Sequence, residues 1–124
     1  MPKKVLVCDD DLYILESVSY VTREEGYEVL TAESGEQGLA LARAERPSLV
    51  FLDVMLPGKN GFEVCHELKS DPATRNIYVI LLTAMGQERD VEEGYQSGAD
   101  EYMTKPFSPR QLRKRMHELL DSNP

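Results

Sequence analysis

The stretch that decides the fold is LVFLD at residues 49–53, in which four apolar residues run directly into one aspartate. A strand with one solvated face alternates apolar and polar residues, so an uninterrupted apolar run indicates a strand buried on both faces. Residues 77–82 form a second run of this kind. Central strands covered on both faces are typical of parallel sheets that have helices packed on each side.

On either side of these runs, short β-type segments alternate with longer amphipathic segments along the chain. Further strands are predicted at 5–8, 27–32 and 101–103. Helices are predicted over 12–25, from a cap at Ser34 to Pro47, from a cap at Asn60, over 87–96, and from Ser108-Pro109 onward. Their inward stripes are predicted to be Ile14, Leu15, Val18 and Val21, then Leu39, Ala40 and Ala42, then Phe62, Cys65 and Leu68, and finally Leu112, Met116, Leu119 and Leu120.

This alternation predicts an α/β fold, a flavodoxin-like doubly wound (βα)5 arrangement. Right-handed crossovers leave few topologies, and the five-stranded parallel order 2-1-3-4-5 is one of the two common ones. In that order the first and third strands are neighbours, and the direction of winding reverses between them. Ligands bind at such a switch point, beyond the carboxyl ends of the strands.

Length and charge bound the functions that the chain can have. Its 124 residues predict one domain, 1–124, with a core over about 3–121 and no effector domain in this chain. Fourteen basic against 22 acidic residues give a net charge of −8. Such a surface argues against direct binding of nucleic acid or of an anionic membrane. It fits a cation or a partner with a basic face.

Location is predicted from cysteine usage and from hydropathy. Cys8 and Cys65 lie in apolar segments and are expected to be buried, reduced thiols, which suits a reducing compartment. No apolar run approaches the roughly 20 residues of a membrane span. The apolar run at residues 5–8 is too short for the core of a signal peptide. We therefore expect a cytoplasmic protein.

Polar side chains follow the predicted strands where the switch-point rule places a ligand. The first strand ends in Asp9-Asp10-Asp11, of which Asp11 is expected to cap the next helix. Asp53 ends the third strand, Thr83 the fourth and Lys105 the fifth. Oxygen ligands that leave room for water suit Mg²⁺, or Mn²⁺, rather than zinc.

This set of groups fits phosphoryl transfer. A carboxylate is a competent nucleophile toward phosphorus. A divalent ion and the Lys105 ammonium would neutralise charge on the transferring group, and the Thr83 hydroxyl can donate a hydrogen bond to it. The loop from Gly58 to Gly61 does not match a nucleotide-binding P-loop.

Four motifs together resemble the receiver domain of two-component response regulators, over about Lys3 to Asp121. They are 5–11 (VLVCDDD), 52–58 (LDVMLPG) with Gly61, 82–84 (LTA) and 98–107 (GADEYMTKPF). The resemblance implies a phosphorylation-activated signalling switch and not an enzyme.

The resemblance also implies how the site works. Asp53 would accept a phosphoryl group from a sensor histidine kinase or a phosphotransfer protein. Asp10, Asp53 and the backbone carbonyl of Met55 would bind Mg²⁺, and Asp9 would assist through water. Lys105 would contact the phosphoryl group together with Thr83, and the bond from Lys105 to the following proline is typically cis in the family.

Signal output is implied in the same way. Tyr102 would turn inward when Thr83 moves, and the change would reach the face formed by helix 4, strand 5 and helix 5. Residues 103–112 look most like receivers attached to winged-helix DNA-binding domains, a subfamily that forms homodimers through ion pairs on this face. Here Asp100 or Glu101 would meet Arg115. A downstream effector domain or protein is the implied partner.

Three other functions are weighed against this one. An FMN-binding module would need a Ser/Thr/Gly-rich phosphate loop after the first strand, where residues 9–11 instead carry three carboxylates. A Mg²⁺-dependent aspartyl-phosphate phosphatase resembles a pattern with a second aspartate two residues after the nucleophile, and Met55 occupies that place. A degenerate receiver that serves only for docking would not need the intact acidic site.

Overall fold

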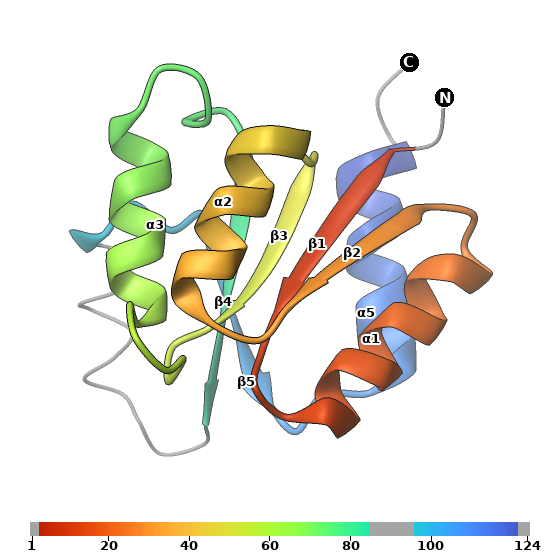
Figure 1. The fold of residues 1–124 in the computed structure, drawn as a ribbon. Coiled ribbons are helices and arrows are strands. Elements are labelled where there is room, and N and C mark those ends of the chain that lie inside the picture. The colour runs from red at the N-terminus through yellow and green to blue at the C-terminus, as the bar shows by residue number, and fades with distance from the viewer. Residues whose placement is uncertain (1–2, 85–95, 122–124) are drawn as a thin grey trace.

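A computed structural model describes residues 3–84 and 96–121, and its centre is one parallel sheet (Figure 1). The strands are β1 (Lys4–Cys8), β2 (Glu28–Ala32), β3 (Leu49–Asp53), β4 (Tyr78–Ala84) and β5 (Glu101–Lys105). They lie in the order β2-β1-β3-β4-β5, so the predicted topology is confirmed.

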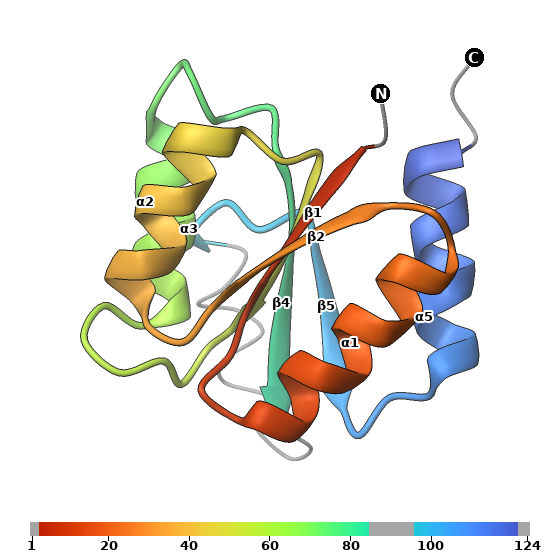
Figure 2. The ribbon, with the colours of Figure 1, turned by 45° about the vertical axis from the view of Figure 1, so that its right-hand side comes forward.

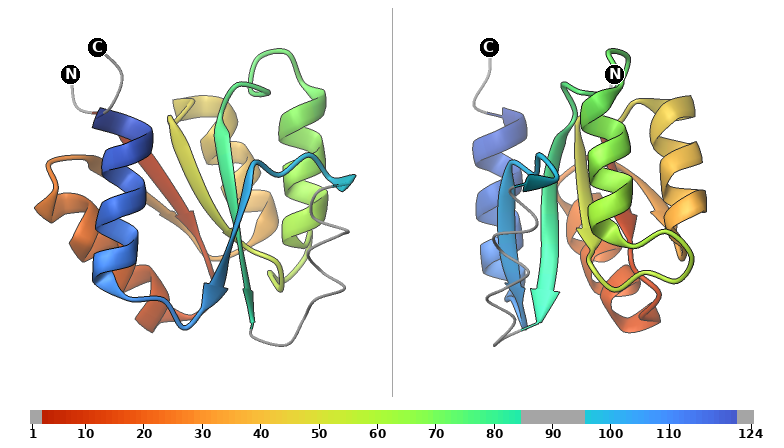
Figure 3. Two further views of the ribbon diagram at one scale, coloured as in Figure 1. Left: turned by 180° about the vertical axis from the view of Figure 1, so that it is seen from behind. Right: turned by 90° about the vertical axis from the view of Figure 1, so that its left-hand side faces the viewer.

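Helices cover both faces of this sheet. The helix α1 (Leu12–Glu24) and the helix α5 (Pro109–Met116) lie on one face, and α2 (Gly35–Glu45) and α3 (Gly61–Ser70) lie on the other (Figures 2 and 3). The chain continues from α5 as a π-helical turn, His117–Asp121, where a single α-helix was expected. The helix predicted over 87–96 lies, apart from its last residue, outside the described residues.

The strand β3 lies at the centre of the core. All five residues of β3 are buried. Val50 and Leu52 pack toward α2 and α3, and Leu49 and Phe51 pack toward α1 and α5. One continuous apolar run therefore supplies both layers of the core, as the prediction of a doubly covered strand requires.

The inward face of α2 differs from the prediction at Ala40, which is exposed. The buried positions are Gly35, Gly38, Leu39 and Ala42. A Cβ atom on Gly38 would lie 2.6 Å from the Cys8 sulfur, so the glycine allows the helix to approach β1 closely. Hydrophobic periodicity cannot detect this contact because glycine contributes no side chain to it.

The last two strands extend beyond their predicted ends. Expected to stop at residues 82 and 103, β4 and β5 continue to Ala84 and Lys105. The ladder pairs Thr83 with Thr104, and Ala84 with Lys105. Because parallel pairing uses backbone groups, polar side chains do not end it. The extension places Thr83 and Lys105 on the sheet and not in loops.

Most predicted helix caps are confirmed. The Asp11 side chain accepts a hydrogen bond from the Tyr13 amide at the start of α1. Reciprocal capping boxes begin α3 (Asn60 with Glu63) and α5 (Ser108 with Gln111). At α2 the Ser34 side chain accepts from the Gln37 amide as predicted, but the Gln37 side chain accepts from the Glu33 amide instead of closing the box.

Cys8 and Cys65 are free and buried, as predicted. Burial, reinforced by the adjacent Asp9 carboxylate, raises the pKa of the Cys8 thiol to about 12, so this sulfur stays protonated at neutral pH. None of the helices in the described part of the chain combines the length and the apolar character that a membrane span needs.

Candidate functional site

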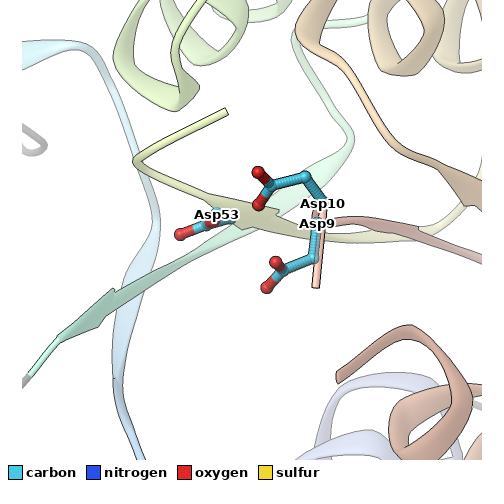
Figure 4. Close-up of side chains that lie close together, drawn as sticks. All are labelled: Asp9, Asp10 and Asp53. Atoms are coloured by element: carbon cyan, nitrogen blue, oxygen red, sulfur yellow. The ribbon is translucent and has the colours of Figure 1, made fainter. Parts of the chain in front are cut away.

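Three carboxylates meet at the carboxyl ends of the two central strands (Figure 4). Asp9 and Asp10 follow β1, and Asp53 is the last residue of β3. Because Cys8 pairs with Leu52 in the parallel ladder, the residues that follow them emerge side by side. One oxygen from each of the three carboxylates lies within 4.8 Å of the others. Asp9 and Asp53 are buried, and Asp10 is exposed to solvent.

An ammonium group from β5 reaches between the two buried carboxylates. The Lys105 Nζ atom lies 2.9 Å from Asp9 Oδ2 and 3.3 Å from Asp53 Oδ1. The peptide bond from Lys105 to Pro106 is cis, as the family resemblance implied.

Main-chain amides complete the contacts of these carboxylates. The Asp11 amide donates to Asp9 Oδ1 at 3.0 Å. The Met55 amide donates to Asp53 Oδ1 at 3.3 Å. The backbone of residue 55 is therefore at the site, where its carbonyl was expected to contribute a metal ligand.

The carboxylates of the site repel one another, and the Lys105 ammonium between Asp9 and Asp53 opposes that repulsion. Two carboxylates roughly 4 Å apart repel by of order 4 kcal/mol at an effective dielectric constant near 20. Burial first, and then the charge of Asp9, raise the pKa of Asp53, although Lys105 and the Met55 amide oppose the shift. Burial alone would lower the pKa of Lys105, but its contacts with Asp9 and Asp53 raise it, so the ammonium stays charged.

We expect Asp53→Asn to stabilise the metal-free protein at neutral pH by about 1 kcal/mol, a typical size for one substitution. The folded state holds the Asp53 proton more tightly than the unfolded chain does, so the wild type gains stability as pH falls through the raised pKa. The advantage of the variant should therefore shrink from neutral pH toward the ordinary aspartate pKa of 3.8. Urea unfolding in EDTA measures this difference, and an advantage that grows on acidification would contradict the assignment.

The three carboxylates fit a hard divalent ion. Their donor atoms are all oxygen, which Mg²⁺ prefers over the nitrogen and sulfur ligands typical of zinc. The exposure of Asp10 leaves the solvent side of the cluster open, and Mg²⁺ usually keeps several water ligands. Asp11 stands apart from this set because its carboxylate caps α1.

Two further predicted residues lie on the strands beside the carboxylates. Thr83 is buried at the end of β4, one position beyond Leu82, which pairs with Asp53. Its hydroxyl lies 3.4 Å from the Ala84 carbonyl oxygen. Tyr102 lies three residues before Lys105 on β5, and its half-buried ring packs against the apolar cluster under α2 and α3. The structure thus groups Thr83 with the acidic cluster and places Tyr102 further along the sheet.

The residues that were expected to form ion pairs between two copies of the chain have partners within one chain. The Arg115 Nε atom lies 2.8 Å from Glu101 Oε2, and the Tyr78 hydroxyl donates to the same carboxylate at 2.8 Å. Asp100 is bound by the Lys69 ammonium at 2.6 Å. A dimer through this face would either replace these contacts with contacts between two chains or leave them intact and use other residues.

The loop after β3 leads to Gly61, which the motif around Asp53 already included, and makes one contact that the sequence did not indicate. A Cβ atom on Gly61 would lie 2.4 Å from the Asp53 carbonyl oxygen, so only glycine lets α3 begin this close to the site. The same loop contacts Glu36 on α2, a residue that resembles any exposed glutamate in a first helical turn. No sequence signal distinguishes Glu36, because its contact joins segments 23 residues apart.

Comparisons with known proteins find related sequences over almost the whole chain. Residues 5–117 match the family described as the response regulator receiver domain. The chain is 43% identical over 120 residues to the alkaline phosphatase synthesis transcriptional regulatory protein PhoP of Bacillus subtilis, covering 97% of this chain and 49% of that protein. It is 42% identical over 118 residues to the phosphate regulon transcriptional regulatory protein PhoB of Pseudomonas aeruginosa, covering 95% and 52%. The chain thus spans about half the length of these relatives.

Solved structures show the same fold over almost the whole chain. The chemotaxis response regulator CheY4 of Vibrio cholerae superposes with a TM-score of 0.89 at 32% identity, covering 97% of this chain and 100% of that one. A BeF3-activated DrrB receiver domain gives a TM-score of 0.86 at 38% identity, covering 98% and 99%.

Proposed function

The chain belongs to the family of response regulator receiver domains, and on that premise we propose that it is a phosphorylation-activated signalling switch with Asp53 as the phosphoacceptor. One observation carries the proposal. Asp53 is a buried carboxylate that lies beside two further carboxylates and 3.3 Å from a lysine ammonium. This is the environment that a phosphoryl group needs, because both a cation site and a fixed positive charge face the nucleophile.

The donor would be the phosphohistidine of a sensor histidine kinase or a phosphotransfer protein. One Asp53 oxygen attacks phosphorus, the phosphorus–nitrogen bond breaks, and its electron pair returns to the imidazole, which takes up a proton. Lys105 and Thr83 would then contact oxygens of the phosphoryl group on Asp53. The chain assists this transfer but does not turn over a substrate, so it acts as a signalling domain and not as an enzyme.

Mg²⁺, or Mn²⁺ in its place, would supply positive charge that neutralises the phosphoryl oxygens. Asp10, Asp53 and the Met55 carbonyl would hold the ion, and Asp9 would assist through water. The exposure of Asp10 beside two buried carboxylates supports an ion that keeps water ligands on its solvent side.

Output would run from Thr83 through Tyr102 to the face that contains β5 and α5. We infer that this face binds a downstream effector domain or protein, or a second copy of the chain, and that neither nucleic acid nor a membrane contacts this domain directly. The whole of 1–124 would act as one receiver unit. The free, buried Cys8 and Cys65 fit a cytoplasmic protein.

The direct test is intact-mass spectrometry after incubation with phosphoramidate and Mg²⁺, followed by proteolysis to locate the modified residue. One phosphoryl group per chain is expected, on the peptide that contains Asp53. A chain that stays unmodified with Mg²⁺ and a fresh donor would refute the proposal.

We expect Lys105→Ala to uncouple phosphorylation from the output face. Beryllofluoride added to the wild type with Mg²⁺ should change amide exchange over β5 and α5, because Lys105 joins the mimic on Asp53 to the end of β5. The variant should show less than half of that change. Lys114→Ala removes the same charge from an exposed position on α5 and is the matched control. An equal response in wild type and Lys105→Ala would contradict the role.

A further inference from the structure

The loop from residue 54 to residue 60, which carries Met55 beside Asp53, rests on the first turn of α2. The Gly35 amide donates to the Pro57 carbonyl at 3.3 Å, which gives one otherwise unpaired amide of the helix start a partner. In return, the Lys59 amide donates to the Glu36 side chain at 3.1 Å. Two hydrogen bonds of opposite direction therefore join the loop to the helix.

The loop and the first turn of α2 are packed so closely that no side chain would fit at two glycine positions. A Cβ atom on Gly35 would lie 1.9 Å from the Lys59 carbonyl oxygen. A Cβ atom on Gly58 would lie 2.2 Å from the Glu36 carboxylate, and Gly58 has a φ of 73°, which side-chain-bearing residues rarely adopt. Glycine at both positions lets the backbone of the loop and the carboxylate of Glu36 come into direct contact.

Glu36 is exposed, so burial does not explain why it holds this position. Hydrogen bonds from the amides of Lys59 and of Glu36 itself lower the pKa of its carboxyl, so the group stays charged at neutral pH. A carboxylate in the first turn also interacts favourably with the helix dipole. The Lys59 ammonium lies 2.6 Å from Glu67 on α3, which ties the same residue to a second helix.

The start of the loop is fixed at the acidic site, and a hydrogen bond joins the two ends of the loop. The Gly61 amide donates to the Val54 carbonyl at 3.0 Å, and the Met55 amide donates to Asp53. The segment that contains Met55 is thus held at Asp53 on one side and at Glu36 on the other. Loss of the Glu36 contact would leave residues 55–59 held to α2 by the hydrogen bond between Gly35 and Pro57 alone, which allows them to shift while Asp53 itself stays in place.

We propose that Glu36 is a positioning residue: through the Lys59 amide it fixes the loop after β3 and so orients the Met55 carbonyl toward the metal site. The inference rests on the proposed function, in which that carbonyl binds Mg²⁺. It assigns a role in metal binding to a helix that contributes no ligand. An outer group that orients a ligand typically changes metal affinity by 10–100-fold when it is lost.

The experiment measures Mg²⁺ affinity by calorimetry for wild type, Glu36→Ala, Glu36→Gln and Glu45→Ala. Glu36→Ala should weaken binding about tenfold, at the lower end of that range. Glu36→Gln keeps an oxygen that can accept from the Lys59 amide and should stay within about twofold of wild type. Glu45→Ala is the matched control, because it removes a carboxylate from the other end of α2 that is bound 2.8 Å from Lys4. Its Mg²⁺ affinity should not change.

Urea unfolding in EDTA, run in parallel, keeps general stability separate from metal binding. Wild-type affinity in Glu36→Ala, or equal weakening in Glu36→Ala and Glu36→Gln, would overturn the inference, since equal weakening would reflect lost charge and not lost positioning. Failure of the wild type to bind Mg²⁺ would overturn the proposed function along with it. The two failures are therefore distinguishable.

Discussion

Asp53→Asn is expected to reduce phosphorylation by phosphoramidate to background, while the wild type takes up one phosphoryl group. An amide oxygen is a poor nucleophile compared with a carboxylate. Asp9 also lies in the acidic cluster beside Lys105, but its side chain is fully buried, whereas the Asp53 side chain keeps 8% of its surface exposed to an incoming donor. The variant keeps an acceptor for the Met55 amide, so the loss should not come from unfolding. Intact-mass spectrometry at matched times provides the comparison.

The control for this experiment is Asp11→Asn. It makes the same chemical change two residues from Asp9, in a side chain that caps α1, and asparagine is an equally good cap. Asp11→Asn should be phosphorylated at the wild-type rate. Modification of Asp53→Asn to the same extent as wild type would show that the phosphoacceptor lies elsewhere and would remove the basis of the proposed function.

Mg²⁺ is expected to raise the melting temperature of the wild type strongly, and Asp10→Asn should lose most of that effect. A ligand that binds only the folded state stabilises it by about 2.7 kcal/mol at 100 times its Kd. For a domain of this size that is of order 10 °C. Asp10 is the exposed member of the cluster, so its replacement removes a ligand without breaking the contacts that Lys105 makes with Asp9 and Asp53.

The same variant should have the opposite effect without metal. In EDTA, Asp10→Asn removes one of three mutually repelling charges and should melt at or above the wild-type temperature. Differential scanning calorimetry in EDTA and in Mg²⁺, at constant ionic strength, tests both signs in one series. A wild type with no Mg²⁺ dependence, or an Asp10→Asn variant with the full wild-type increase, would refute the metal site.

Much of the architecture could be predicted from the sequence because local patterns report burial. The unbroken run at residues 49–53 indicated a strand covered on both faces, and the alternation with amphipathic segments left few topologies for a parallel sheet. Since carboxyl ends of neighbouring parallel strands share one edge, the aspartates after β1 and β3 could be expected together. The structure brings Asp9, Asp10 and Asp53 together at that edge.

How close these groups come, and which atoms pair, is set by the packing of the folded chain and could not be predicted from the sequence. The insertion of Lys105 between Asp9 and Asp53, and the pairing of Arg115 with Glu101 within one chain, depend on side-chain reach across elements that are distant in the sequence. Periodicity also misplaced Ala40 and gave no sign of the contact between Glu36 and Lys59. The apolar pattern of a sequence indicates which side chains are buried. Contacts made by glycine, backbone amides and exposed carboxylates depend instead on the distance between packed elements, which the pattern does not report.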